Sequence, residues 1–333
     1  MKKLLVVALV LTCMLFSIVA QGQGEAGEKT YTLRFGHTLT PEDEFHKAYE
    51  RWGQRVSEKT GGKLKIEVYP SSQLGVEEDV LEQIKQGSNV GWQTDPGRLG
   101  NYVNEFSIFY MPFFLEGGMA DVEKLLKSAE VKSWCEKLEK EHHIKVISYA
   151  WVQGNRSIMA NKIAKSPSEL SGMLIRTAPA PAWVACVNSL GCKAVALAYG
   201  EMYNGIQTKV VDGCELPYAA AKNMKINEVA KYIIETNHIF QLNVMVCSAD
   251  WFNALPDDYK TILVEECDKA GLEASKVHVD GAAADRQYLV DHGMTLIPNS
   301  ELDMEAFRKA GDQAYKELGL LETKAKIFKE LGK

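Results

Sequence analysis

A regular alternation of strand and helix patterns restricts the possible folds of this chain more than any other feature. From Tyr31, the segment YTLRFGHTL alternates apolar and polar residues, as a half-buried strand does. A segment with apolar residues at helical spacing begins at Thr40 and ends at Gly61. The segment KLKIEVYP predicts a second strand, and a second helical pattern follows Gly75. Strands that alternate with helices pair in parallel through helical crossovers, so the sequence predicts an α/β sheet covered on both faces.

The same rhythm continues through the rest of the chain. We expect strands at 90–94, 144–150, from 193, 232–235 and 242–247, helices at 122–138 and 183–190, and an aromatic loop at 106–114. A helical pattern runs from Pro256 toward His292, about 50 Å at the usual rise per residue, and we expect it to span two lobes. No polar linker or internal repeat is visible. Two lobes joined by several crossing segments are therefore favoured, with a ligand site between them.

The first 22 residues have the pattern of a signal peptide. Lys2 and Lys3 precede an apolar run from Leu4 to Val19, which is shorter than the roughly 20 residues of a membrane-spanning helix. Small residues at positions 20 and 22 offer a cleavage site. The residues before Cys13 form a poor lipidation motif, which favours a soluble periplasmic protein over a lipoprotein. We expect no direct membrane insertion after the signal is removed.

Composition excludes some functions and leaves one question open. The formal net charge is −6 and no basic block occurs, which argues against nucleic-acid binding. The six cysteines beyond residue 22 show no CxxC pairing, so neither a zinc site nor a disulfide framework is indicated. Cys186 and Cys192 are near enough in sequence to form a bridge, but scattered buried thiols are the favoured interpretation.

Two arginines at the ends of predicted strands suggest an anion site. In SPSELSGMLIRTAP, Arg176 leaves a short apolar strand just before a proline-containing turn, and Arg156 lies twenty residues earlier at the start of another apolar segment. A guanidinium group presents planar pairs of donors that match a carboxylate. The alternative is that each is a surface residue or the ion-pair partner of a glutamate.

Aromatic residues near the same strand ends suggest the walls of such a site. Trp92, Trp151 and Trp183 can stack on an apolar or aromatic ligand, although core packing is the commoner role of any single tryptophan. Asp95 can accept a hydrogen bond from an amine or a similar ligand group. His37 follows a strand and a glycine, and either lines the cleft or makes a structural hydrogen bond.

No catalytic or cofactor motif accompanies these residues. The chain lacks the patterns GxGxxG, GxxxxGK[ST], HExxH and GxSxG, and no acid, base and nucleophile assemble. We therefore predict a binding protein without a metal or cofactor rather than an enzyme.

Several longer segments together resemble the solute-binding proteins of tripartite ATP-independent periplasmic (TRAP) transporters, the DctP family. The likeness covers nearly the whole mature chain. The segments that carry it are GGKLKIEVYPSSQLG, EFSIFYMPFF, SPSELSGMLIRTAP and AYGEMYNGIQTKVVDGCELP. The last two are the most specific.

The resemblance implies a fold and a binding mode. It implies a two-lobed periplasmic binding protein fold with crossing segments and a long lobe-spanning helix. Lobe I is expected at 30–153 and 242–281, and lobe II at 154–241 and 282–333. The resemblance also implies that Arg176 forms the main salt bridge to a substrate carboxylate, that Arg156 assists, and that the partners are a small organic anion and the TRAP membrane permease subunits.

One residue departs from the family pattern. Many members have asparagine where this chain has Leu216, within CELP, and the change makes the site more apolar. Together with the tryptophans, this favours an aromatic or indole-type carboxylate as ligand. A small aliphatic keto or hydroxy acid is the alternative, and a ligand-sensing protein that reports to a membrane kinase is a different use of the same cleft.

Overall fold

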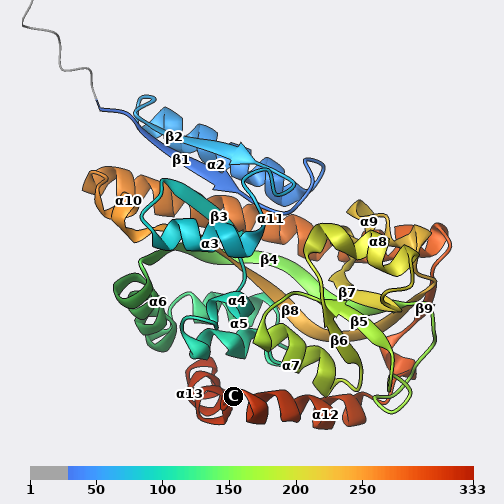
Figure 1. Ribbon diagram of the computed structural model, residues 1–333. Coiled ribbons are helices and arrows are strands. Elements are labelled where there is room, and N and C mark those ends of the chain that lie inside the picture. Colours follow the sequence, from blue (N-terminus) through green and yellow to red (C-terminus); the bar gives the residue numbers. More distant parts are fainter. Residues whose placement is uncertain (1–28) are drawn as a thin grey trace, which may run out of the picture.

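The computed structural model describes residues 29–333, so the predicted signal peptide lies outside the described residues. The strands form one sheet in the order β2-β1-β3-β8-β4-β7-β5-β6, with β9 beside β8 (Figure 1). At one end, β1 (Tyr31–Gly36) pairs in parallel with β2 (Leu64–Tyr69) and β3 (Val90–Thr94). Helices α2 (Glu44–Lys59) and α3 (Glu77–Lys85) connect these strands, which confirms the predicted alternation.

The other end of the sheet repeats this construction. β5 (Leu174–Thr177) pairs in parallel with β6 (Lys193–Ala196) and β7 (Gly213–Pro217). Their connections contain α7 (Pro181–Ser189) and α8 (Met202–Gln207). Parallel strands again place their carboxyl ends at one edge, where Arg176 is the second-last residue of β5.

Two long strands join the two ends. β4 (Ile144–Ala160) and β8 (Tyr232–Ser248) each have 17 residues and pair with each other in antiparallel fashion. β8 also pairs with β3, and β4 also pairs with β7. The sequence predicted shorter, separate strands here. The structure instead keeps the strands continuous through several shifts of register, near Gly154 and elsewhere, so both lobes share one sheet.

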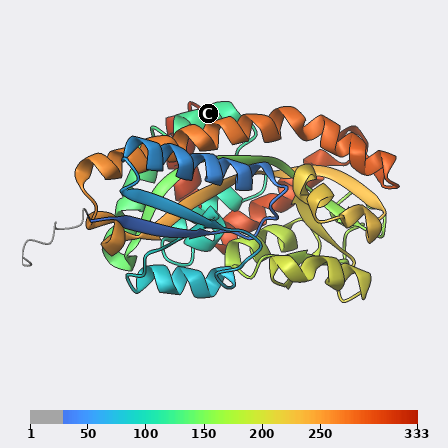
Figure 2. The ribbon, with the colours of Figure 1, turned by 90° about the horizontal axis from the view of Figure 1, so that it is seen from above.

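The long helix α11 (Asp257–Asp291) has 35 residues, close to the predicted bounds, and runs along much of the molecule (Figure 2). It packs on β4, on α2 of lobe I and on α9 (Tyr218–Asn223) of lobe II, so it spans both lobes as expected. Gly271 allows close packing, since a Cβ atom there would lie 2.6 Å from Nε1 of Trp151.

The remaining elements are further helices and the strand β9, which pairs with β8 in the sheet. They are α4 (Pro96–Leu99), η1 (Asn104–Tyr110), α5 (Met119–Leu125), α6 (Ala129–His142), η2 (Tyr199–Glu201), η3 (Ile226–Glu228), α10 (Ala249–Asn253), β9 (Thr295–Ile297), η4 (Asn299–Glu301), α12 (Met304–Glu317) and α13 (Leu321–Leu331). The aromatic segment predicted as a loop contains η1, whose aromatic residues are buried in the core of lobe I.

The C-terminal helix differs from the predicted lobe division. α13 lies in the range expected for lobe II, yet it packs on α5 and η1 of lobe I. The chain turns at Gly319 after α12, and α13 then buries Ile327 and Leu331 in the same apolar cluster as Phe106 and Trp134. An amphipathic helix packs with its apolar face against another apolar surface. The sequence pattern predicts the apolar face but not the surface that it contacts.

Two further expectations concern cysteines and membranes. All six cysteines in the described residues are free thiols, so the bridge between Cys186 and Cys192 is not formed. Within residues 29–333, no helix is long and apolar enough to cross a membrane.

Candidate functional site

A small cavity lies between the two lobes, where the long strands meet the strand ends of both halves. Its volume is about 50 Å³, so the lobes are close together around it. Most of the residues that line it have polar side chains. The lining residues are Thr38, Leu39, Glu77, Gln93, Thr94, Asp95, Arg98, Gln153, Arg156, Arg176, Ala178, Trp183, Tyr199, Leu216, Ala220, Gln241 and Asn243. Five of the eight predicted site residues are among them: Arg176, Arg156, Asp95, Trp183 and Leu216.

Arg176 enters the cavity from β5 as a buried cation. Its side chain donates from Nε and Nη2 to the carbonyl oxygen of Leu197, over 3.0 and 2.7 Å. The residue is only 2% exposed, and no salt bridge joins it to any carboxylate of the described residues. Burial lowers the pKa of Arg176 to about 10, and the more distant charge of Glu215 offsets this effect only in part. A buried cation with no paired carboxylate attracts an anionic solute.

Arg156 is also buried, but its charge is already compensated. From β4, its Nε forms an ion pair with the carboxylate of Glu215, while Nη2 donates to the Glu215 carbonyl oxygen and Nη1 to Gln241. Its guanidinium lies 4.5 Å from the ring centroid of Trp183. Burial alone would raise the pKa of Glu215, but the charge of Arg156 and the contacts of Glu215 with Arg156 and His238 together hold that pKa below its ordinary value. The two predicted arginines therefore differ in charge balance.

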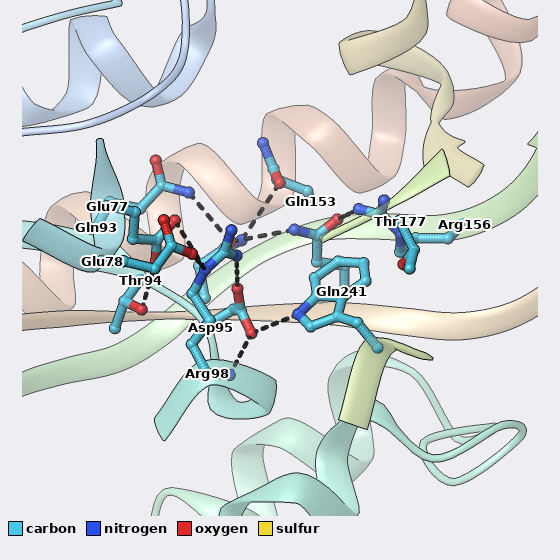
Figure 3. A network of polar contacts seen from close by, with 12 residues as sticks. Glu77, Glu78, Gln93, Thr94, Asp95, Arg98, Gln153, Arg156, Thr177 and Gln241 are labelled. Carbon is cyan, nitrogen blue, oxygen red and sulfur yellow. Dashed lines mark hydrogen bonds and ion pairs between the residues drawn. The ribbon is translucent and has the colours of Figure 1, made fainter. Parts of the chain in front are cut away.

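A third arginine, Arg98, belongs to a network that the sequence analysis missed (Figure 3). Asp95 caps α4 by accepting from the backbone N–H of Arg98 over 2.9 Å, and its other oxygen lies 2.6 Å from Nη1 of Arg98. Nε of Arg98 lies 3.1 Å from Glu78 and 3.4 Å from Glu77. The motif DPGRL, an acidic cap followed by proline and arginine, was a usable signal for this network.

Glu77 is the member of this network with the least favourable setting for a charge. It lines the cavity and accepts a hydrogen bond from the Thr94 hydroxyl over 2.6 Å. Burial raises the pKa of Glu77 to about 7, although the charge of Arg98 opposes the rise. Glu77 thus titrates near neutral pH inside the cavity.

Buried amides form the central part of the cavity lining. Gln93 of β3 and Gln241 of β8 both donate from Nε2 to Oδ1 of Asn243, over 3.1 and 3.2 Å. Gln153 of β4 lies next to Asn243, and Oε1 of Gln93 has no hydrogen-bond partner among the described residues. Gln241 and Asn243 lie two residues apart on β8, so they share a face of the sheet. The two amides inside the apolar run IFQLNVMV of β8 were the sequence signal for Gln241 and Asn243.

The three tryptophans are not equivalent. Trp183 lines the cavity, donates from Nε1 to Asp95 over 2.9 Å, and packs against Tyr110. Trp92 and Trp151 are fully buried and are absent from the cavity lining. Trp92 packs over Gly36, and neighbouring residues of a strand point to opposite faces, which leaves the cavity face to Gln93.

Trp151 and His37 are core residues of lobe I. The ring centroid of Trp151 lies 4.7 Å from that of Tyr49 and 5.2 Å from that of Phe45. His37 Nε2 lies 3.0 Å from His46 Nδ1, and His37 is not among the lining residues. Burial lowers the pKa of His37 to about 3, so this imidazole is neutral, and it packs against His46 and Tyr49 of α2.

Comparison with known proteins decides the family. Residues 35–320 match the family model described as "Bacterial extracellular solute-binding protein, family 7", DctP. The chain belongs to this family. Family 7 contains the periplasmic solute-binding proteins of TRAP transporters, and its members are transport receptors rather than enzymes.

Three similar proteins show how this DctP-family protein compares with its relatives. It is 27% identical to the C4-dicarboxylate-binding periplasmic protein DctP of Vibrio cholerae, with 80% of each chain covered. A TRAP solute-binding protein of Ochrobactrum anthropi with bound L-fuconate is 25% identical, with a TM-score of 0.85, and 91% of this chain and 99% of that chain are covered. An unliganded open structure from Escherichia fergusonii is 29% identical, with a TM-score of 0.78 over 90% of this chain and 99% of that chain.

Proposed function

We propose that this receptor binds a polyhydroxylated monocarboxylic acid, such as a sugar acid, and delivers it to the membrane permease of a TRAP transporter. The observation that carries the proposal is the environment of Arg176. It is a buried cation that lines the cavity and has no salt bridge to a carboxylate of the described residues. A solute carboxylate supplies the missing negative charge through charge-assisted hydrogen bonds.

The charge balance of the cavity favours one carboxylate over two. Arg156 is paired with Glu215, and Arg98 with Asp95, so Arg176 is the lining arginine that remains unpaired. A second carboxylate on the solute would compete with protein carboxylates for an arginine that is already paired. This charge balance differs from the one expected of a receptor for C4-dicarboxylates, the solutes named for the Vibrio cholerae relative.

The uncharged part of the lining favours hydroxyl groups on the solute. Gln93, Gln153, Gln241 and Asn243 offer several amide donors and acceptors, and Oε1 of Gln93 is buried without a partner among the described residues. A hydroxyl group can both donate to and accept from such amides, whereas an apolar group would leave them unsatisfied. The bound L-fuconate of the Ochrobactrum anthropi protein is a solute of this class.

An aromatic or indole-type acid, expected from the tryptophans and Leu216, has less support. Trp92 and Trp151 lie in the core, so Trp183 and Leu216 alone remain of the predicted apolar wall. A small aliphatic keto or hydroxy acid would satisfy Arg176 and stays the alternative.

Calorimetry on the Arg176→Lys variant tests the proposal. The titrants are L-fuconate, D-galactonate, pyruvate, succinate and indole-3-acetate. We expect a sugar acid to bind most tightly to the wild-type protein. We expect Arg176→Lys to weaken it by about 1.5 to 3 kcal/mol, because lysine keeps the charge but not the planar pair of donors.

Arg308→Lys is the matched control, because Arg308 forms an exposed ion pair with Glu116 and neither residue lines the cavity. Its affinity for every titrant should equal that of the wild type. Unchanged sugar-acid affinity in Arg176→Lys would remove Arg176 from the site, and tighter binding of succinate or indole-3-acetate by the wild type would reject the proposed solute class.

A further inference from the structure

A second polar junction joins the lobes outside the cavity, and a buried aspartate lies at its centre. Asp43 Oδ1 accepts from the backbone N–H of Phe45 over 2.9 Å, at the start of α2 in lobe I. Asp43 Oδ2 accepts from Nδ2 of Asn223 over 3.0 Å, at the end of α9 in lobe II. His278 Nε2, on α11, lies 3.5 Å from Asp43 Oδ1. Asp43, Asn223 and His278 are called the lobe junction below.

The carboxylate of Asp43 depends on these partners because it is only 1% exposed. Burial alone would raise its pKa, but the nearby His278 imidazole, together with the hydrogen bonds from Phe45 and Asn223, holds the pKa below its ordinary value. Only Phe45 belongs to the same helix as Asp43. Separation of lobe II from lobe I would therefore remove the bond from Asn223, and water would have to replace it.

The lobe junction lies beside the cavity without taking part in its lining. Leu39 and Ala220 line the cavity, whereas Asp43, Asn223 and His278 do not. Leu39 is four residues before Asp43, and Ala220 is three residues before Asn223. The junction thus holds together two segments that line the cavity from opposite lobes, and its own residues lie outside the cavity lining.

The fold of this chain is more similar to that of a ligand-bound relative than to that of an unliganded open relative. The TM-score is 0.85 against the protein with bound L-fuconate and 0.78 against the unliganded open protein, although the open protein has the higher sequence identity, 29% against 25%. Sequence identity therefore does not explain why the TM-score is higher for the ligand-bound protein. A lobe arrangement more similar to that of the ligand-bound protein explains it, and in this arrangement Asn223 contacts Asp43.

We propose that Asp43, Asn223 and His278 are positioning residues that stabilise the closed arrangement and so set the affinity of the cavity for its solute. The apparent Kd of a solute equals its intrinsic Kd divided by the fraction of protein in the competent state. A hydrogen bond that exists only in the closed state raises that fraction. The inference rests on the proposed function only in taking the cavity as the solute site.

Two substitutions of Asn223 test the junction, because this half-buried residue is on a helix end and outside the cavity lining. Asn223→Ala removes the donor to Asp43. Asn223→Asp places a second carboxylate about 3 Å from the first, where like charges repel. The matched control is Asn204→Ala, an exposed asparagine on α8 of the same lobe.

With L-fuconate as the probe, we expect Asn223→Ala to raise the Kd about tenfold or more, chiefly through faster dissociation. Asn223→Asp should raise it further, and Asn204→Ala should leave it unchanged. Stopped-flow fluorescence measures the dissociation rate, and urea unfolding of the solute-free variants checks that their stability is retained. Wild-type values of both Kd and dissociation rate in the two Asn223 variants would overturn the proposal.

Small-angle scattering of solute-free protein gives a readout that needs no ligand. Asn223→Asp should have a larger radius of gyration than the wild type, and an equal radius would contradict the junction. The failure of each proposal is distinguishable. Unaltered binding in Arg176→Lys removes the proposed solute contact and leaves the scattering result intact, whereas unaltered scattering removes the junction and leaves Arg176 in place.

Discussion

The two sides of the cavity differ in whether a buried arginine is paired with a carboxylate. On the lobe I side, Arg98 lies within 3.4 Å of the carboxylates of Asp95, Glu78 and Glu77. On the lobe II side, Arg176 donates to a backbone carbonyl and has no salt bridge among the described residues. A paired arginine is part of the scaffold, because its charge is already compensated. An unpaired one retains its attraction for a charge from outside.

Arg156 shows that position alone does not decide this difference. It lies on the same side as Arg176 and lines the same cavity, yet Glu215 neutralises it. Its proposed role of assisting at the solute carboxylate remains a prediction. The structure favours an indirect contribution, in which Arg156 holds Gln241 and the ring of Trp183 in place.

The largest expected effect comes from removing each arginine and measuring stability. Arg156→Met leaves Glu215 buried without its cation and should reduce the free energy of unfolding by about 3 to 5 kcal/mol. Arg176→Met removes an uncompensated buried charge and should be neutral or stabilising in solute-free protein. Urea denaturation at pH 7 measures both. Equal losses in the two variants would show that the two arginines do not differ as described.

A smaller effect should appear in the pH dependence of binding. Burial raises the pKa of Glu77 to about 7, in a setting that includes Arg98, Asp95, Glu78 and Thr94. Glu77 is protonated below that pH and becomes an anion in the cavity above it. Affinity for an anionic solute should therefore fall as pH rises from 6 to 8, by on the order of 1 kcal/mol.

Glu77→Gln should flatten this pH profile, since glutamine keeps the polar contact and does not titrate. The raised pKa of Glu77 also affects the stability of the fold. The raised pKa means that the native state retains a proton which the unfolded chain releases above pH 4.5, so stability is lost as pH rises toward 7. Calorimetric titrations with the solute at pH 6, 7 and 8 measure the pH dependence of binding. If the affinity of Glu77→Gln changes with pH as that of the wild type does, the pH dependence belongs to another group.

The smallest expected effect concerns Leu216, an apolar residue among the polar residues of the lining. Leu216→Asn should weaken an indole-type acid by about 1 kcal/mol, because an amide that faces an apolar ring loses water without gaining a partner. Sugar acids and small hydroxy acids should be weakened less or bind more tightly. The measured quantity is the ratio of the Kd of indole-3-acetate to that of L-fuconate, and an unaltered ratio would mean that Leu216 does not contribute to selectivity.

The sequence by itself determined the features that depend on local pattern. The alternation of strands and helices from Tyr31 onward, the long helix after Pro256 and the strand that carries Arg176 all follow from hydrophobic periodicity and turn residues. Signature segments added the family, which the comparison with known proteins confirmed. These features can be predicted from the sequence because residues that are close together in the chain determine them.

Tertiary structure decided which residues meet across the chain. Glu215 neutralises Arg156 from 59 positions away, and Asn243 contacts Gln93 across 150 positions, so no local pattern revealed these pairs. The same pairing left Arg176 without a carboxylate partner among the described residues and placed Trp92 in the core. The charge state and polarity of a cavity depend on such long-range contacts, and the fold alone brings them together.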